Sequence, residues 1–347
     1  MTLPSRRSTW LLAATLTLAG GAHAASFDCK AAKSTTEKAI CGSPTLSALD
    51  EQLARDYERA LHALSPAGGL RLKESQRSWL RYATQVCTPR KGVKRDEPMA
   101  ECLAPEFKDR LAQLAQVGLR LGPYVFNRID FYASGRVRDD QGGRPGYVTD
   151  HVAYPQIDTP VTPATTAWNA AQRKDAASGE LQGSDDPDAT GNEDDDTDYT
   201  LACANERFIS LQVDQQEYTH GTPHGQYSHD TQNAVLAPAM RKMGANDFFA
   251  AGSTWKARLP PLFVAAWLRN GADPEAPPSV KEAIEAAAAD PGRWLVTPEG
   301  LRIAFSEGEV GCHACDPGPI TVGWAALKRL QPAADLAACK APPAAKP

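Results

Sequence analysis

The stretch PTLSALDEQLARDYERALHAL at residues 44–64 decides the first part of the fold. Its apolar residues recur at intervals of three and four, which places them on one face of a helix. They are Leu46, Leu49, Leu53, Tyr57, Leu61 and Leu64. Ser43 can cap this helix and Pro44 can take its first position. The sequence therefore predicts a helix over residues 44–64 that is stopped by the Pro- and Gly-containing segment 65–69.

Two further helices are predicted from the same spacing. The first runs from about residue 70 to residue 86 and turns four side chains inward: Leu72, Trp79, Leu80 and Ala83. The second carries a stripe made of Leu103, Phe107, Leu111, Leu114 and Leu121. Because short loops join the helices, we expect a small antiparallel helical domain. We interpret Trp79 as a packing residue of its core.

Beyond residues 122–123 the apolar period falls to two, the period of a half-buried strand. The alternation covers residues 209–214, 301–306 and 320–324, and residues 128–133 follow it more weakly. These segments predict strands in the second part of the chain.

Helices are predicted between these strands. One covers residues 262–270, after Pro260 and Pro261, and another begins at Ser279, where Glu282 would complete a capping box. Strands mixed with helices, without the regular spacing of βαβ units, favour the α+β class. We therefore expect a small, disulfide-stapled antiparallel helical domain at the N-terminus, followed by a mixed α+β domain.

The first 24 residues have the features of a secretory signal peptide. Arg6 and Arg7 precede an apolar run at residues 9–21, and Ala22-His23-Ala24 is a small-x-small cleavage site. We expect an exported protein, periplasmic or secreted, without a lipid anchor. No later segment reaches ~18 consecutive apolar residues, so we expect no membrane-spanning helix.

Length and charge bound the remaining organisation. At 347 residues, with 42% hydrophobic residues, the chain can form about two domains of ~150 residues. Residues 25–120 carry 16 basic and 12 acidic residues, whereas the tract at 185–198 holds eight acids and no base. The formal charge of −5 argues against a nucleic-acid partner. The expected parts are a signal peptide at 1–24, a helical domain at 25–121, an α+β domain at 122–335 with a solvated acidic loop at 179–198, and an Ala/Pro-rich tail at 336–347.

Eight cysteines follow the expected cleavage site. They are Cys29, Cys41, Cys87, Cys102, Cys203, Cys312, Cys315 and Cys339. In an oxidising compartment they predict up to four disulfides. Short separations favour Cys29 with Cys41 and Cys87 with Cys102. The other four cysteines allow three connectivities, of which we favour Cys312–Cys315 with Cys203–Cys339.

The N-terminal motifs form an ordered set. They are FDC at 27–29, EKAIC at 37–41, LD at 49–50, QRSWL at 76–80, Cys87 and CL at 102–103. This set resembles the N-terminal domain of the LprI-type lysozyme inhibitors over residues 27–118. The resemblance implies export to the cell envelope and inhibition of lysozyme.

A second set of motifs lies further along the chain. It comprises YPQI at 154–157, WN at 168–169, FISL at 208–211, Tyr218, GTPH at 221–224, DFF at 247–249 and VGW at 322–324. It resembles the extracytoplasmic domain of RsiV-type anti-sigma factors, which sense lysozyme by binding it. The family usually has alanines where Thr222 and Pro223 stand, and no sigma-binding segment is found, so signalling is not implied. The two resemblances single out Trp79, Tyr218, Gly221 and His224 as structural or binding positions.

Two clusters could carry metal or redox chemistry. His220, His224 and His229 lie close in sequence, and His313 lies inside Cys312-His313-Ala314-Cys315. Zinc could bind such residues, but exported cysteines oxidise and we expect local structure instead. The same Cys pair has the spacing of a thiol oxidoreductase, yet it lies between two strands rather than at a helix N-terminus. We expect no metal and no cofactor.

The remaining charged clusters are expected to be solvated. Residues 186–197 loosely follow a calcium-binding loop, but Thr197 stands where that loop requires a bidentate Glu. The basic cluster Arg90, Lys91, Lys94 and Arg95 could contact anionic cell-wall polymers. We find no catalytic motif and expect no enzyme and no catalytic residue.

Three hypotheses follow in order of preference. The first is an exported envelope protein that binds lysozyme and inhibits it sterically. The second is a cell-wall or envelope module without lysozyme contact. The third is a thiol oxidoreductase that uses Cys312 and Cys315.

Overall fold

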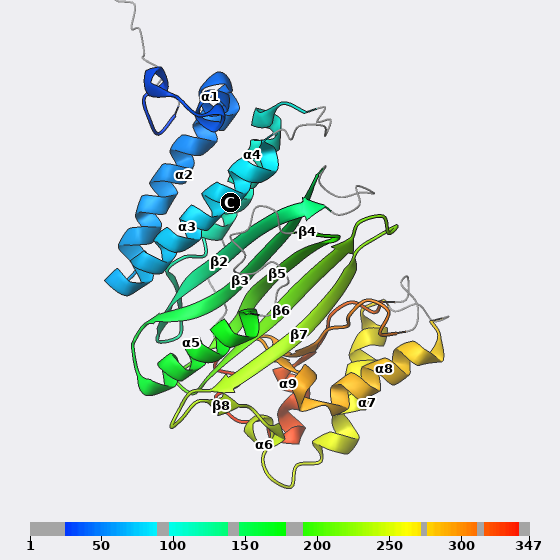
Figure 1. Ribbon diagram of the computed structural model, residues 1–347. Coiled ribbons are helices and arrows are strands. Elements are labelled where there is room, and N and C mark those ends of the chain that lie inside the picture. The colour runs from blue at the N-terminus through cyan, green and yellow to red at the C-terminus, as the bar shows by residue number, and fades with distance from the viewer. Residues whose placement is uncertain are drawn as a thin grey trace, which may run out of the picture.

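The computed structural model describes residues 25–88, 97–137, 146–177, 190–271, 276–310 and 316–339. Figure 1 shows four N-terminal helices beside one edge of a large sheet, and a C-terminal lobe at the other side. The large sheet has eight strands, and the C-terminal lobe holds a second sheet of three. The predicted α+β class, with a helical part followed by a mixed part, is confirmed.

The helical part contains a short 3₁₀ turn and four helices. The helices are α1 (Thr35–Gly42), α2 (Pro44–Ala63), α3 (Pro66–Cys87) and α4 (Met99–Leu114). The predicted start of α2 is confirmed, since the Ser43 hydroxyl accepts a hydrogen bond from the Leu46 amide at 3.3 Å. Helix α1 was not predicted, although Ser34 and Glu37 form a capping box at its start.

Two helix boundaries differ from the prediction. Ser65 caps α3 and Pro66 is its first residue, so segment 65–69 opens the next helix instead of forming a separate stop. The N-cap hydroxyl satisfies the Gly68 amide, which offsets the low helix propensity of the two glycines. Helix α4, the third of the predicted helices, ends at Leu114 rather than reaching Leu121. The chain turns at Gly118, which has a φ of 75°, and Leu121 therefore belongs to a strand.

The structure contains three disulfides among its described residues. Cys29 is joined to Cys41, Cys87 to Cys102 and Cys203 to Cys339, the three pairs that the sequence favoured. Cys312 and Cys315 lie outside the described residues. The Cys203–Cys339 bond, over a separation of 136 residues, ties the large sheet to the end of the described chain.

The large sheet follows the order β1-β2-β3-β5-β6-β7-β8, with β4 paired to β2. Its strands are β1 (Leu119–Leu121), β2 (Tyr124–Val137), β3 (Tyr147–Thr159), β4 (Thr190–Gly191), β5 (Glu193–Ala204), β6 (Phe208–Thr219), β7 (Gln226–Val235) and β8 (Arg241–Lys242). Strands β3 and β5 run parallel, and α5 (Pro163–Ala176) makes the crossover between them. The Asn169 amide group bonds both the N–H and the C=O of Ile157, at 2.7 and 2.9 Å, which anchors α5 to β3.

The interpretation of the acidic tract as a solvated loop is wrong for residues 190–198. These residues form β4 and the first half of β5, and residues 193–201 pair in continuous register with β6. Every second carboxylate has a specific partner, described below, and this compensates for the missing apolar period. Residues 185–189 lie outside the described part of the chain.

The C-terminal lobe packs around an aromatic core. Phe248, Phe249, Trp255 and Trp294 contact one another with ring centroids 5.0 to 6.3 Å apart. The elements of the lobe are α6 (Ala245–Phe248), α7 (Trp255–Arg269), α8 (Pro278–Ala289), β9 (Leu295–Val296), β10 (Gly300–Ile303), β11 (Ile320–Gly323) and α9 (Trp324–Leu327).

Three expectations for this lobe need correction. Helix α7 begins at Trp255 and includes both prolines, because Trp255, Leu259 and Phe263 bury one face of it. Ser279 does not form a capping box, since its hydroxyl donates to the Val310 carbonyl at 3.0 Å. The packed chain continues past residue 335, where Leu336 is fully buried.

Helix α3 covers the edge of the sheet along β2. The Ser75 hydroxyl accepts from the Asp130 amide at 3.3 Å, and the Ser78 hydroxyl bonds the Tyr132 backbone at 3.0 and 3.1 Å. These hydroxyls take the place of a neighbouring strand and shield the edge. The helical part and the sheet therefore share a buried contact, which includes Tyr132 and Tyr147 packed with the helical core.

Candidate partner-binding surface

Strand β5 turns its acidic side chains alternately to the two faces of the sheet, as strand geometry requires. Asp194, Asp196 and Asp198 point to the face on which α4 lies, which we call the helix side. Glu193 and Asp195 line a hollow on the opposite face, which we call the groove side. One strand thus contributes carboxylates to two different environments.

A buried ion cluster occupies the helix side. Asp130 lies at its centre, where Arg110 Nη1 donates to Oδ2 at 2.8 Å and Arg128 Nε donates to Oδ1 at 2.7 Å. These three side chains have no exposed surface. Burial opposes the ionisation of Asp130, but the charges of both arginines and the hydrogen bond from His151 hold its pKa well below the usual range.

His151 connects this cluster to β5. Its Nε2 lies 3.3 Å from Asp130 Oδ1 and its Nδ1 lies 3.2 Å from Asp196 Oδ1. Burial disfavours the imidazolium, yet the hydrogen bonds with both carboxylates outweigh burial and raise the pKa of His151 to about 9. The ring is therefore protonated at neutral pH, stacked on Tyr132 with centroids 4.4 Å apart.

The other helix-side carboxylates of β5 are paired as well. Asp198 Oδ1 accepts from Arg128 Nη1 at 2.7 Å. Asp194 Oδ1 accepts from the amide and hydroxyl of Thr149, at 2.7 and 3.0 Å, and its Oδ2 lies 3.0 Å from His220 Nε2. These contacts join β5 to β2, β3 and β6 and fix the position of the acidic half of the strand.

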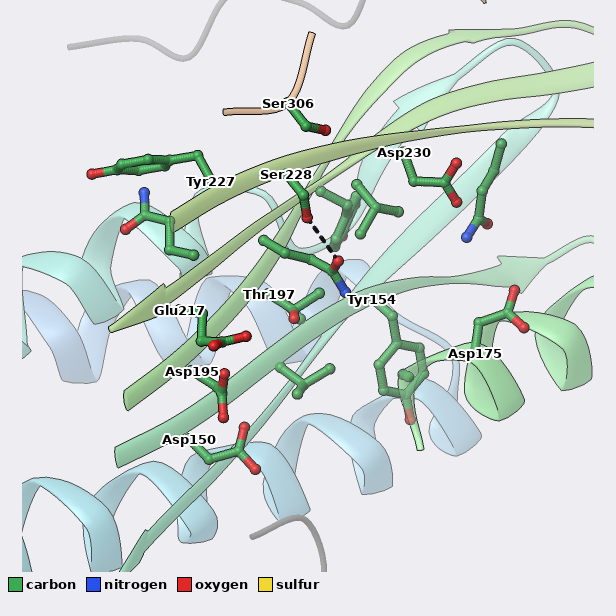
Figure 2. Close-up of a pocket in the computed structure, with 18 of the residues that line it drawn as sticks. Asp150, Tyr154, Asp175, Asp195, Thr197, Glu217, Tyr227, Ser228, Asp230 and Ser306 are labelled. Atoms are coloured by element: carbon green, nitrogen blue, oxygen red, sulfur yellow. Dashed lines mark hydrogen bonds between the residues drawn. The ribbon is translucent and has the colours of Figure 1, made fainter. Parts of the chain in front are cut away.

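The groove on the opposite face has a volume of about 760 Å³. Its floor is formed by β3, β5, β6 and β7, and the last turn of α5 and residues 306–307 form its walls. Figure 2 shows Asp150, Asp195 and Glu217 in a row across three neighbouring strands, as their register requires. The carboxylates that line the groove are Asp150, Asp175, Glu193, Asp195, Glu217, Asp230 and Glu307. Lys and Arg are absent from the described lining, so the groove is strongly acidic.

A cleft of about 660 Å³ lies on the helix side, between α4 and the sheet. Its α4 wall includes Glu106, Asp109 and Gln113. Five residues line both the cleft and the groove: Asp195, Gln216, Glu217, Gln226 and Tyr227. The cleft and the groove therefore meet where β6 ends and β7 begins.

Three of the four residues singled out by resemblance lie at this same end of the sheet. Tyr218 lines the cleft, Gly221 has a φ of 91° in the loop that joins β6 to β7, and His224 is exposed in that loop, 3.4 Å from Glu307. Trp79 lies at the inner wall of the cleft, 1% exposed and edge-on to Phe107 with centroids 5.1 Å apart. Its burial is that of a packing residue.

The candidate metal ligands do not come together. His220 pairs with Asp194 and His229 with Asp214, at 3.0 and 2.6 Å. Within the described ranges, no group of three or more His, Cys, Asp or Glu side chains is arranged to hold a metal ion. Residues 190–197 are strands, which does not fit a calcium-binding loop. The Cys312–Cys315 motif with His313, and the basic cluster at residues 90–95, lie outside the described residues.

Sequence reasoning missed His151, Asp130 and Tyr227. Asp130 and His151 lie in strands whose apolar alternation is weak, and their role depends on partners that are distant in sequence. Tyr227 is the second residue of β7, after the hairpin loop, and is 49% exposed. Its position next to a turn that contains Gly and Pro could have indicated an exposed aromatic residue.

Comparison with known proteins supports the first resemblance. The family model described as lysozyme inhibitor LprI matches residues 29–114, which confirms the LprI-like character of the helical part. No curated protein matches the chain. Among solved structures, a member of the DUF3298 family from Bacteroides fragilis is 14% identical, with a TM-score of 0.40, over 63% of this chain and 97% of that chain. The likeness to RsiV-type domains remains a prediction.

In the part of the chain that the structure describes, no helix is both long and apolar enough to span a membrane.

Proposed function

We propose that this protein binds lysozyme and inhibits it by steric obstruction. The match of residues 29–114 to the lysozyme inhibitor LprI model carries the proposal. That segment includes both local disulfides and the buried Trp79, so it covers most of the core of the helical part. Inhibition of this kind needs a complementary surface and no covalent chemistry.

The electrostatics of the sheet support a cationic partner. Many lysozymes are cationic, and an acidic surface accelerates their approach and favours the correct orientation. The groove and the cleft both have acidic linings without Lys or Arg among their described residues. The helical part alone, with a net charge of +4 over residues 25–120, offers less attraction.

The cell envelope is the proposed location. Three disulfides among the described residues fit an oxidising compartment. The expected signal peptide at residues 1–24 would direct the chain there, to the periplasm or beyond. We also propose residues 25–121 as the LprI-like domain and the chain from residue 122 as a separate α+β unit.

The experiment uses the oxidised chain from residue 25 onward. Immobilised protein is exposed to c-, g- and i-type lysozymes, and each retained lysozyme is assayed for cell-wall hydrolysis with added protein. We expect retention of at least one type and loss of its activity at a near-equimolar ratio. Failure to retain any type, together with sedimentation on purified peptidoglycan, would favour the cell-wall module instead.

A further inference from the structure

The end of the sheet formed by the start of β5, the end of β6 and the start of β7 has an unusual surface. We call residues 193–196 and 215–228 the acidic sheet end. Figure 1 shows its β6–β7 loop on the side away from the N-terminal helices, and residue 307 of the C-terminal lobe holds the start of β7, where the Glu307 amide donates to the Tyr227 carbonyl at 2.9 Å. The cleft lies on one side of it and the groove on the other, and four of their five shared residues are Gln216, Glu217, Gln226 and Tyr227. All four of these residues are exposed.

We propose that the acidic sheet end is the wedge that enters the open substrate cleft of a lysozyme. The inference rests on the proposed function and names the surface that performs it. A sheet end with a hollow on each side complements a concave partner whose two lips reach into the hollows. The surface lies outside the LprI-like segment, apart from the α3 and α4 walls of the cleft.

Charge complementarity selects a cationic occupant. On the groove side, the lips of the partner would meet Glu193, Glu217 and Asp230, and on the cleft side they would meet Asp109. Carboxylates accept charge-assisted hydrogen bonds from Arg and Lys. The described lining of both hollows offers no Lys or Arg that would compete for these carboxylates.

Tyr227 supplies the apolar anchor. It is 49% exposed and pairs in register with Gln216 across the hairpin, so it stands at the centre of the shared surface. Exposed tyrosines surrounded by polar side chains dominate the binding energy of many interfaces. The side-chain amides of the neighbouring Gln216 and Gln226 can both donate and accept hydrogen bonds, so they can pair with either kind of polar group around Tyr227.

The wedge is ordered before the partner arrives. Residues 217 and 226 close the β6–β7 ladder, and Asp194 and Asp196 tie the adjoining end of β5 to Thr149 and His151. A surface that is already fixed loses little conformational entropy on binding. Rigid insertion would exclude the glycan substrate without any chemical step.

The test compares two double variants of the chain from residue 25 onward. Glu217→Gln with Tyr227→Ala alters the wedge, and Glu285→Gln with Leu268→Ala makes the same kinds of change on α8 and α7. Glu285 and Leu268 are exposed, and neither lines the groove or the cleft. Circular dichroism and thermal unfolding establish that both variants are folded. Calorimetric titration with a c-type lysozyme then gives the dissociation constants, and g- and i-type lysozymes are titrated in turn.

We expect the wedge variant to bind at least about tenfold more weakly, with a parallel loss of inhibition, because truncation of a central anchor commonly has this effect. The control variant should stay within about twofold of the unaltered chain. If the unaltered chain binds lysozyme and the folded wedge variant binds equally well, the wedge is wrong and the proposed function stands. If the unaltered chain binds none of the three lysozyme types, both fall.

Discussion

The two faces of β5 present the same chemical group in opposite roles. On the helix side, Asp194, Asp196 and Asp198 each meet a donor or cation from another strand. On the groove side, Glu193 lines a hollow whose described walls offer carboxylates, amides and hydroxyls but no Lys or Arg. A run of acidic residues in sequence is therefore not one feature. Strand alternation divides it into a half that stabilises the fold and a half that lines the groove, which we propose faces the partner.

The largest effect is expected from removing Asp130, the β2 carboxylate at the centre of the helix-side ion cluster. Asp130→Ala leaves Arg110 and Arg128 buried without their shared counter-ion, so we expect a loss of about 3–5 kcal/mol in the free energy of unfolding. Denaturant titration measures it. The variant Trp79→Ala removes a buried apolar side chain and is expected to cost a similar ~3–5 kcal/mol. The loss measured for Asp130→Ala is compared with the loss measured for this variant. A loss below ~1 kcal/mol for Asp130→Ala would show that the cluster is not essential to the fold.

The pH dependence of stability sharpens the same comparison. His151 has a folded-state pKa of about 9 against an ordinary 6.5, so protonation favours the folded protein. Its contribution is fully present below pH ~6.5 and is lost as the pH rises through about 9, by about 3 kcal/mol. Unfolding curves of the unaltered chain and of His151→Gln should converge over this window. Parallel curves would contradict a charged His151.

The smallest expected effects come from Asp194 and Glu193, which are neighbours in β5 and point to opposite faces of the sheet. Asp194→Ala leaves the Thr149 amide and the His220 ring without their acceptor, at a cost of about 1–2 kcal/mol. Glu193→Ala, one residue earlier, should change the free energy of unfolding by less than ~0.5 kcal/mol. Chemical denaturation of both variants under the same conditions measures the two free energies of unfolding. Equal losses would remove the distinction between the faces.

The sequence predicted the elements whose signals are local. Ser43, Pro44 and the apolar stripe after them define α2, and the alternation of Ile209, Leu211 and Val213 defines the start of β6. Strand β5 could not be predicted in this way because its first six residues include five acids and no apolar residue. Its register depends on Arg128 and Thr149, which are 70 and 45 residues away from their carboxylate partners.

The candidate surface was only partly predictable for the same reason. Family motifs pointed to Tyr218, Gly221 and His224, which share one end of the sheet. Nothing local to Glu217 or Tyr227 indicated that two hollows meet there, because that follows from the packing of α4 and α5 on opposite faces. The acidic residues 193–198 cannot be treated as a solvated loop either, because they form the first half of β5.

The measurement that tests the central claim most directly is the rate of lysozyme association by surface plasmon resonance at low and physiological salt. Two variants are compared with the unaltered chain: Glu193→Gln with Glu217→Gln on the groove side, and Asp194→Asn on the helix side. We predict that the groove-side variant associates severalfold more slowly, with a weaker salt dependence and unchanged stability. Asp194→Asn removes one charge that is already paired with Thr149 and His220, so it should lose stability and slow association less than the groove-side variant. An unchanged association rate for the groove-side variant, or an equally large slowing for Asp194→Asn, would contradict the division of β5 into a mainly structural face and a mainly partner-binding face.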